Sequence, residues 1–103
     1  MTDRIAQLKK LLEANPDDAF CLYALAMEYA ASGRHEEAIR HFDSAIASDA
    51  EFCYAYYHKA RSQKAMSDTE NALATLRRGL QQAQSTSDAK AATEITTLLE
   101  SMT

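Results

Sequence analysis

The chain has 103 residues, of which 47% are hydrophobic and 25% are charged, and its formal net charge at pH 7 is −4. This length suits one small domain, and two Gly and one Pro are too few for a loop-rich or all-β fold. Residues 1–52 hold ten acidic and five basic side chains. This acidic half disfavours nucleic acid as a general partner, because contacts to phosphate need positive surface.

Three further features bear on the cellular setting. The sequence has no run of about 18 apolar residues, so we expect no membrane-spanning helix. Its first residues lack the continuous apolar stretch of a secretory signal. Cys21 and Cys53 have no C-x-x-C or His-Cys spacing, which favours two free thiols over a disulfide. We therefore expect a cytoplasmic protein.

The first predicted element is a helix over residues 3–14, which ends before Pro16 because the residue before a proline is pushed out of the helical region. An apolar stripe at helical spacing marks this helix: Ile5, Leu8, Leu11 and Leu12. A second helix is expected over residues 18–32, with Asp17 as its N-cap and Gly33 closing it.

A third helix is predicted over residues 35–48, with acidic residues in its first turn, where the helix dipole favours anions. A fourth is expected over 50–66 with Asp49 as its cap. The run from Ser67 to Glu70 has the form of a capping box, which predicts that a fifth helix starts there and ends near Gln82.

The last predicted helix covers residues 88–102, after a polar connection that contains N-cap residues. Its apolar side chains lie on one face and its polar side chains on the other. The terminal helix of a helical stack needs one polar face that is exposed to solvent. The sequence therefore predicts six helices with short connections.

The segment from Ala19 to Phe52 carries a repeat pattern. Apolar and small residues recur at the spacing that two packed antiparallel helices need: Leu22, Leu25, Ala26, Tyr29, Gly33, Ala38, Phe42, Ala45 and Ile46. The segment resembles a tetratricopeptide repeat, a helix–turn–helix unit of about 34 residues. One such period after Ala26, Ala38, Phe42 and Ile46 the sequence has Ala60, Ala72, Leu76 and Leu80.

The resemblance implies an all-α, right-handed solenoid of about six helices in a single domain. Its parts would be an N-terminal half repeat (1–16), a repeat (19–52), a degenerate repeat (53–86) and a C-terminal capping helix (87–103). Lys59 and Gln63 stand in the degenerate repeat where the preceding repeat has apolar Leu25 and aromatic Tyr29. The sequence leaves the role of these two polar residues open.

Catalytic and metal-binding patterns are not found. His35 and His41 are six residues apart, which does not place them on one helix face, and no Cys or carboxylate completes a ligand set with them. Gly33 and Gly79 alone cannot form a glycine-rich phosphate loop. We therefore expect neither an enzyme nor a cofactor or metal site.

In the resembled family, the first helix of each repeat lines a concave groove that holds peptides. The resemblance places the groove positions at Phe20, Tyr23, Met27, Tyr54, Tyr57, His58, Arg61 and Lys64, and on the last helix at Asp88, Ala91, Ala92 and Ile95. Aromatic residues and Arg carry much of the energy of interfaces, although aromatics at helical spacing are also typical of a core. We expect a protein–protein interaction module, an adaptor or scaffold, whose partner is an unidentified protein or peptide.

Some members of the family clamp the terminal carboxylate of heat-shock chaperones with two Lys, two Asn and an Arg. The matching positions here are Tyr23, Met27, His58, Asp88 and Ala92. None of the five matches in type, so the sequence does not predict this carboxylate clamp.

Two alternatives remain open. A homodimer could form through the apolar stripe of the first helix (Ile5, Leu8, Leu11, Leu12), because an exposed apolar stripe indicates an interface. Single-stranded nucleic acid could bind basic residues interleaved with tyrosines (Lys59, Arg61, Lys64, Arg77, Arg78). The overall acidity counts against the second alternative, and no nucleic-acid partner is expected.

Overall fold

The computed structural model describes residues 2–103. Its helices are α1 (Thr2–Ala14), α2 (Ala19–Ala31), α3 (His35–Ser48), α4 (Cys53–Ala65), α5 (Thr69–Ser85) and α6 (Ala89–Ser101). Every helix packs against the next one in the chain, and the described residues form no strand. The prediction of an all-α stack of six helices is confirmed.

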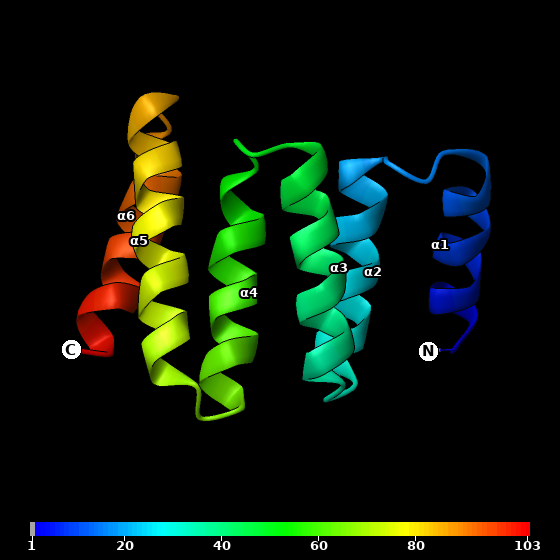
Figure 1. The fold of residues 1–103 in the computed structure, drawn as a ribbon, viewed down its shortest axis with the longest axis horizontal. Helices are drawn as coiled ribbons and strands as arrows, with labels where there is room; N and C mark the ends of the chain where they lie inside the picture. Colours follow the sequence, from blue (N-terminus) through cyan, green and yellow to red (C-terminus); the bar gives the residue numbers. More distant parts are fainter. Residues whose placement is uncertain (1) are drawn as a thin grey trace.

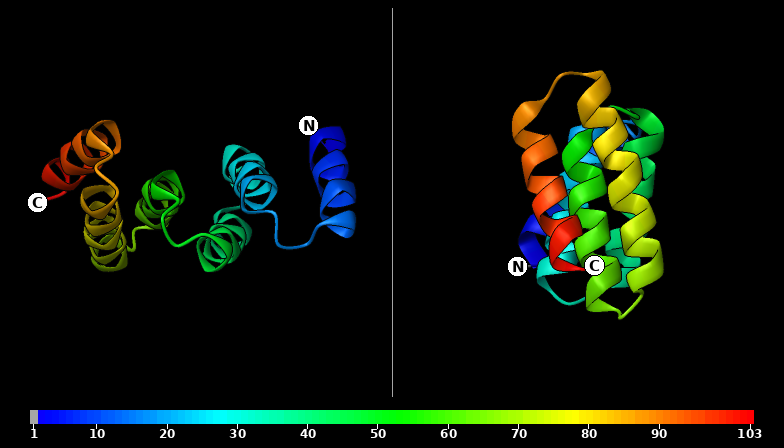
Figure 2. Two further views of the ribbon diagram at one scale, coloured as in Figure 1. Left: turned by 90° about the horizontal axis from the view of Figure 1, so that it is seen from above. Right: turned by 90° about the vertical axis from the view of Figure 1, so that its left-hand side faces the viewer.

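The helices form two rows. Consecutive helices are antiparallel, with their axes across the long axis of the stack (Figure 1). Seen from above, α2, α4 and α6 make one row, and α3 and α5 make the other (Figure 2, left). The molecule measures 38 × 29 × 18 Å along its principal axes, and its shortest dimension fits two layers of helices packed about 8–10 Å apart. None of the described helices has the length and apolar character needed to cross a membrane.

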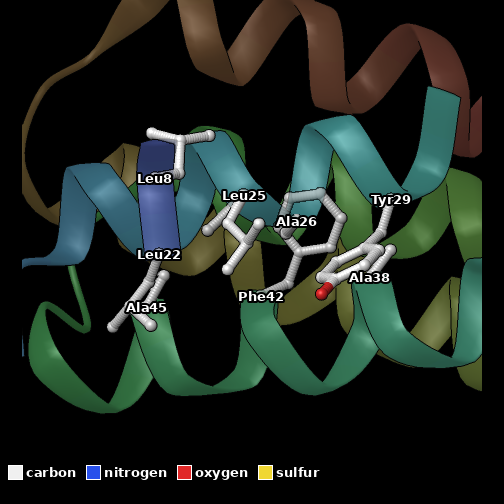
Figure 3. Close-up of a cluster of buried hydrophobic side chains, with 9 residues drawn as sticks. Leu8, Leu22, Leu25, Ala26, Tyr29, Ala38, Phe42 and Ala45 are labelled. Atoms are coloured by element: carbon white, nitrogen blue, oxygen red, sulfur yellow. The ribbon is translucent and has the colours of Figure 1, made fainter. Parts of the chain in front are cut away.

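Small residues hold the two helices of each hairpin together. Ala26 of α2 and Ala38 of α3 have no exposed surface, and the residues one period later, Ala60 and Ala72, have none either. An Ala at such a site lets two helix backbones approach closely. The predicted repeat period is therefore visible in the core, and Figure 3 shows its first part around Phe42.

Helix α1 is partly covered by its own chain. Leu8 is only 5% exposed and joins the core of α2 and α3, and Ile5 and Leu12 pack against that core. Leu11 alone of the predicted stripe is largely exposed, at 57%. Only part of the stripe is thus left without a partner in the chain, and a homodimer through α1 stays a prediction that would rely on Leu11.

Lys59 and Gln63 are accommodated by polar partners on neighbouring helices. The Lys59 ammonium lies 2.6 Å from a carboxylate oxygen of Asp43 on α3, with 14% of the lysine side chain exposed. Gln63 is buried, and its amide oxygen accepts a hydrogen bond of 2.8 Å from the Thr75 hydroxyl. One period earlier, Tyr29 packs on the ring of His41. A hydrogen bond thus replaces an aromatic contact at the same place in the repeat, and the buried amide oxygen has its partner.

Three of the turns share one backbone design. After α2, the amide of Arg34 donates to the carbonyl of Tyr29, and the amide of Gly33 donates to the carbonyl of Ala30. This pair of bonds is a Schellman motif, which needs a left-handed residue after the helix. Gly33 takes that conformation at φ +78°, and Ser67 and Ser87 take it in the turns after α4 and α5 at φ 63° and 58°.

The predicted caps need correction. The N-cap of α2 is Asp18 rather than Asp17, and its carboxylate accepts from the amide of Cys21 at 3.0 Å. Asp49 does not cap α4, because its carboxylate accepts from the amide of Glu51 inside the turn, and the helix begins only at Cys53. The expected capping box at Ser67 is absent, since that residue is the left-handed residue of the turn.

Helix α5 is longer than its counterpart. It has 17 residues against 14 for α3, and it ends at Ser85 rather than near Gln82. The N-cap of α4, Phe52, follows the N-cap of α2, Asp18, by one predicted period, but the N-cap of α6, Asp88, comes two residues later than the next period requires. Every position of α6 is therefore displaced by two residues from the predicted period.

The strained turn residues generate a matched pair of predictions. A left-handed residue other than Gly costs roughly 1–2 kcal/mol in the folded state, and part of this is offset because Gly has a freer unfolded chain. We expect Ser67→Gly to raise the free energy of unfolding by about 0.5–1 kcal/mol and Gly33→Ser to lower it by a similar amount. Urea denaturation measures both, and a loss of stability in Ser67→Gly would contradict the assignment.

Gly79 on α5 generates a second prediction. A Cβ at this position would lie 2.7 Å from the Cβ of Tyr56 on α4, which cannot move without its backbone. We expect Gly79→Ala to lower stability by about 1–3 kcal/mol through overpacking, although Ala is the better helix former. The control is Gln81→Ala on the exposed side of α5, which should change stability by less than about 0.5 kcal/mol. Equal stability of the Gly79→Ala variant and the parent would rule out the close contact.

Candidate functional site

The row formed by α2, α4 and α6 carries two open pockets. The first, here called the α2–α4 pocket, has a volume of about 310 Å³ and is lined by Met27, Ala30, Ala31, His35, His58, Arg61, Ser62 and Ala65. Its walls are mostly methyl and methylene groups, with the Arg61 guanidinium as a charged group. The imidazole of His35 is held by Ser62, whose hydroxyl lies 3.1 Å from its Nδ1.

The second pocket, here called the α4–α6 pocket, has a volume of about 260 Å³. It is lined by Tyr57, Thr93, Glu94, Thr97, Leu98 and Ser101. Counted from the N-caps of their helices, four of its α6 residues correspond to four α4 residues of the first pocket: Glu94 to His58, Thr97 to Arg61, Leu98 to Ser62 and Ser101 to Ala65. One wall of each pocket is therefore built from equivalent positions of successive repeats, while the opposite walls differ, and together we call the two pockets the groove.

An aromatic cluster adjoins the groove. Tyr23 packs on Phe42, Phe52 and His58, with ring centroids 6.0, 4.7 and 5.8 Å away. Tyr57 meets His58 edge to face at 5.0 Å and Tyr54 at 6.3 Å. The sequence left open whether these rings belong to the core or to a binding surface. Both are true in part, because the half-buried tyrosines pack on core residues and keep one side exposed.

The predicted groove residues occupy different environments. Met27, His58 and Arg61 line the α2–α4 pocket, and Tyr57 lines the α4–α6 pocket. Phe20 is 68% exposed and lies 6.3 Å from the Tyr23 ring. Lys64 is exposed and lines neither pocket, and Tyr54 reaches α6 through its hydroxyl.

Three of the four positions predicted on the last helix were wrong. Ala91 and Ile95 have no exposed surface, and the carboxylate of Asp88 caps α6 by accepting from the amide of Ala91. The displacement of two residues moves the groove positions of α6 to Lys90, Thr93, Glu94 and Thr97. Sequence reasoning also missed two lining residues, His35 and Ser62. His35 belongs to α3, outside the row of α2, α4 and α6, and reaches the pocket from the first turn of its helix.

His58 has an unusual protonation equilibrium. Burial, and then the positive charge of Arg61, lower the pKa of His58 to about 4. The imidazole is therefore neutral at physiological pH and acts in the groove as an aromatic, hydrogen-bonding surface. Arg61 remains the charged group of the α2–α4 pocket, and its guanidinium also lies 6.0 Å from the Tyr57 ring.

Family models and solved structures agree on the class of this chain. One tetratricopeptide repeat model matches residues 1–53, and a second matches residues 54–86. The chain belongs to the tetratricopeptide repeat family. The predicted resemblance is confirmed, and tetratricopeptide repeat domains are generally interaction modules without catalytic activity. A search of curated proteins finds no match to this chain.

Solved tetratricopeptide repeat domains superimpose closely. The TPR2B domain of yeast Sti1, in a complex with pHsp70, is 26% identical with a TM-score of 0.90, over 95% of this chain and 78% of that one. The Yersinia enterocolitica translocator chaperone SycD is 16% identical with a TM-score of 0.90, over 98% and 70%. PcrH, in complex with the chaperone-binding region of PopD, is 17% identical with a TM-score of 0.91, over 98% and 77%. The latter two support the fold alone.

The displaced α6 also changes the positions that correspond to a tetratricopeptide repeat carboxylate clamp. The two expected at Asp88 and Ala92 lie instead at Lys90 and Glu94. Lys90 matches the basic type, but Glu94 has the opposite charge. With Tyr23 and Met27 unchanged, the groove still differs from that clamp.

Three of the basic residues considered for nucleic acid lie in separate environments. The Lys59 charge is paired with Asp43, and the Arg78 guanidinium lies 5.8 Å from the Tyr56 ring, while Arg61 faces the groove. Across residues 2–103, no group of three or more His, Cys, Asp or Glu side chains is arranged to hold a metal ion.

The low pKa of His58 predicts how stability depends on pH. Between about pH 6.5 and pH 4 the unfolded chain protonates this imidazole while the folded protein does not, so protons favour unfolding. We expect the free energy of unfolding to decrease as the pH is lowered from about 6.5 to about 4, and to decrease more steeply in the parent than in His58→Gln. Urea titrations at several pH values measure the two slopes, with His41→Gln as a control that keeps His58. Parallel curves for the parent and His58→Gln would contradict the assigned pKa.

Proposed function

We propose that this protein is an interaction module that binds a peptide segment of a partner protein along the groove of α2, α4 and α6. The observation that carries the proposal is that two open pockets lie along this helix row and that four positions of α4 and the equivalent four positions of α6 line them. A peptide whose backbone crosses the helix row can place a side chain in each pocket. A regular spacing of pockets is typical of a surface that reads an extended chain.

The residues in and beside the groove suit this role. Exposed Phe20 and the half-buried rings of Tyr23, Tyr54 and Tyr57 offer amphipathic surface, and aromatic side chains and Arg supply most of the energy at interfaces. Met27 adapts its shape to different side chains. Arg61 provides a cationic edge where a carboxylate of the peptide can bind. The Sti1 domain, at 26% identity, supports the same class of function, because it was solved with pHsp70 bound.

A matched pair of variants tests the groove. Ala31 and Ala65 are exposed, line the α2–α4 pocket and end their helices, so Ala31→Lys/Ala65→Lys fills the pocket and leaves the core intact. The control is Ala47→Lys/Ala74→Lys, the same change at exposed positions of α3 and α5 in the other row. Circular dichroism and thermal unfolding establish that both variants are folded.

The binding probe is a phage-displayed library of random ten-residue peptides selected on the parent protein. We expect the enriched peptides to bind the parent in fluorescence anisotropy, to lose at least about tenfold in affinity with the groove variant, and to bind the control within about twofold (tenfold is about 1.4 kcal/mol). Peptides that bind the groove variant as tightly as the parent, or a library that yields no binder, would overturn the proposal.

A further inference from the structure

The α4–α6 pocket differs from its equivalent in charge. Among its lining residues Glu94 is the one that carries a charge, and it stands where His58 stands in the α2–α4 pocket. Thr93, Thr97 and Ser101 add hydroxyl groups, and Leu98 and the Tyr57 ring add apolar surface. One groove thus presents a cation, Arg61, in its first pocket and an anion in its second.

The Glu94 carboxylate is held in position by the neighbouring helix. The hydroxyl of Tyr54 on α4 donates a hydrogen bond of 2.6 Å to Glu94 Oε2. This bond, together with burial, raises the pKa of Tyr54 to about 12, so the phenol keeps its proton and stays a donor at neutral pH. One carboxylate oxygen is therefore oriented by Tyr54, and the other remains able to accept from a ligand.

No cation of the described chain forms an ion pair with Glu94. The ion pairs found among residues 2–103 join Arg4 to Glu28, Arg34 to Glu37 and Lys59 to Asp43. Arg61 lies over the Tyr57 ring instead, and Lys90, one helical turn before Glu94, is exposed and does not line the pocket. A half-buried carboxylate with no cationic partner is where a cation from a ligand gains the most.

The rest of the pocket matches a basic side chain as well. An aliphatic stem can lie along Leu98 and Tyr57, as the stems of Lys and Arg do on apolar surfaces, while the charged end reaches Glu94. The hydroxyls of Thr97 and Ser101 can accept the remaining N–H donors.

We propose that the α4–α6 pocket binds the Lys or Arg side chain of the partner peptide, with Glu94 as its counter-ion and Tyr54 as the residue that positions Glu94. This inference rests on the proposed function of the groove. With Arg61 facing an acidic residue in the other pocket, the two opposite charges fix the direction of the peptide. Adjacent helices in a row are roughly 10 Å apart, so the acidic and basic residues are about three positions apart in an extended peptide.

Peptides enriched from the random ten-residue library on the parent protein test this assignment. We expect them to contain a Lys or Arg in excess of the starting library. For the tightest one, replacing that Lys by norleucine, or an Arg by citrulline, removes the charge and retains the stem. The parent should then lose about tenfold in affinity, which is typical for a hydrogen bond to a charged group.

A double-mutant cycle identifies Glu94 as the counter-ion. Glu94→Gln keeps the shape and an oxygen that can accept from Tyr54, so the helix contact survives while the charge is lost. This variant should bind the charged peptide about tenfold more weakly than the parent does, and should bind charged and neutral peptides within about twofold of each other. The control Glu100→Gln, at an exposed position of the same helix that does not line the pocket, should retain the parent's preference.

The outcomes separate this inference from the proposed function. Peptides that bind the groove but show no excess of basic residues, or that lose equal affinity on charge removal in the parent and in Glu94→Gln, would overturn the cation site and leave the groove in place. Peptides that also bind the pocket-filling variant Ala31→Lys/Ala65→Lys as tightly as the parent would overturn the groove itself. Coupling between the peptide charge and Glu94, together with loss of binding in the pocket-filling variant, supports both.

Discussion

The close contact of alanines inside each helical hairpin is the constraint on which the rest of the structure depends. Ala26 against α3 and Ala60 against α5 bring the paired helices near enough for Phe42 and Leu76 to fill the space beside them. A hairpin of this size cannot cover its own apolar surface, so it stacks on its neighbours. Stacking at a regular distance is what sets α2, α4 and α6 side by side and leaves an open pocket on either side of α4.

Much of the fold could be predicted from the sequence, because the core follows a fixed period. The repeat period placed Ala72 and Leu76 in the core, and both have no exposed surface. The turns were harder to predict, since Ser67 adopts the left-handed conformation of Gly33 only because the surrounding helices impose it. The polar residues Lys59 and Gln63 could not be interpreted from the sequence, because their partners, Asp43 and Thr75, lie on other helices.

Four of the predicted groove residues on α2 and α4 line pockets, whereas the positions predicted on α6 are displaced by two residues. A strictly constant period assigned Asp88 to the place of Tyr54, although Tyr54 is the second residue of its helix and Asp88 is the N-cap of the next one. The sequence already indicated this difference, because Asp88 was expected at the start of the last helix. The additional length of α5 places Glu94 in the groove. The second pocket therefore carries a negative charge, whereas the first carries the positive charge of Arg61. Local helix length thus determines the chemistry of the site.

The burial of His58 determines both its protonation state and its packing in the groove. Burial that keeps His58 neutral also lets it pack between Tyr23 and Tyr57, so the charge of the α2–α4 pocket comes from Arg61. In the next repeat, Glu94 takes the place of His58, and one of its carboxylate oxygens accepts a hydrogen bond from the Tyr54 hydroxyl. One scaffold position therefore supplies an aromatic surface in one pocket and an anion in the other.

Chemical-shift mapping tests the central claim that a peptide crosses the row of α2, α4 and α6. The measurement is a ¹⁵N–¹H spectrum of the labelled protein titrated with the tightest library peptide. The account predicts that the largest shifts fall on residues of both pockets, such as Ala31, Arg61 and Thr97, with small changes on the outer faces of α3 and α5. Shifts concentrated on α3 and α5, or on α1 around Leu11, would contradict it.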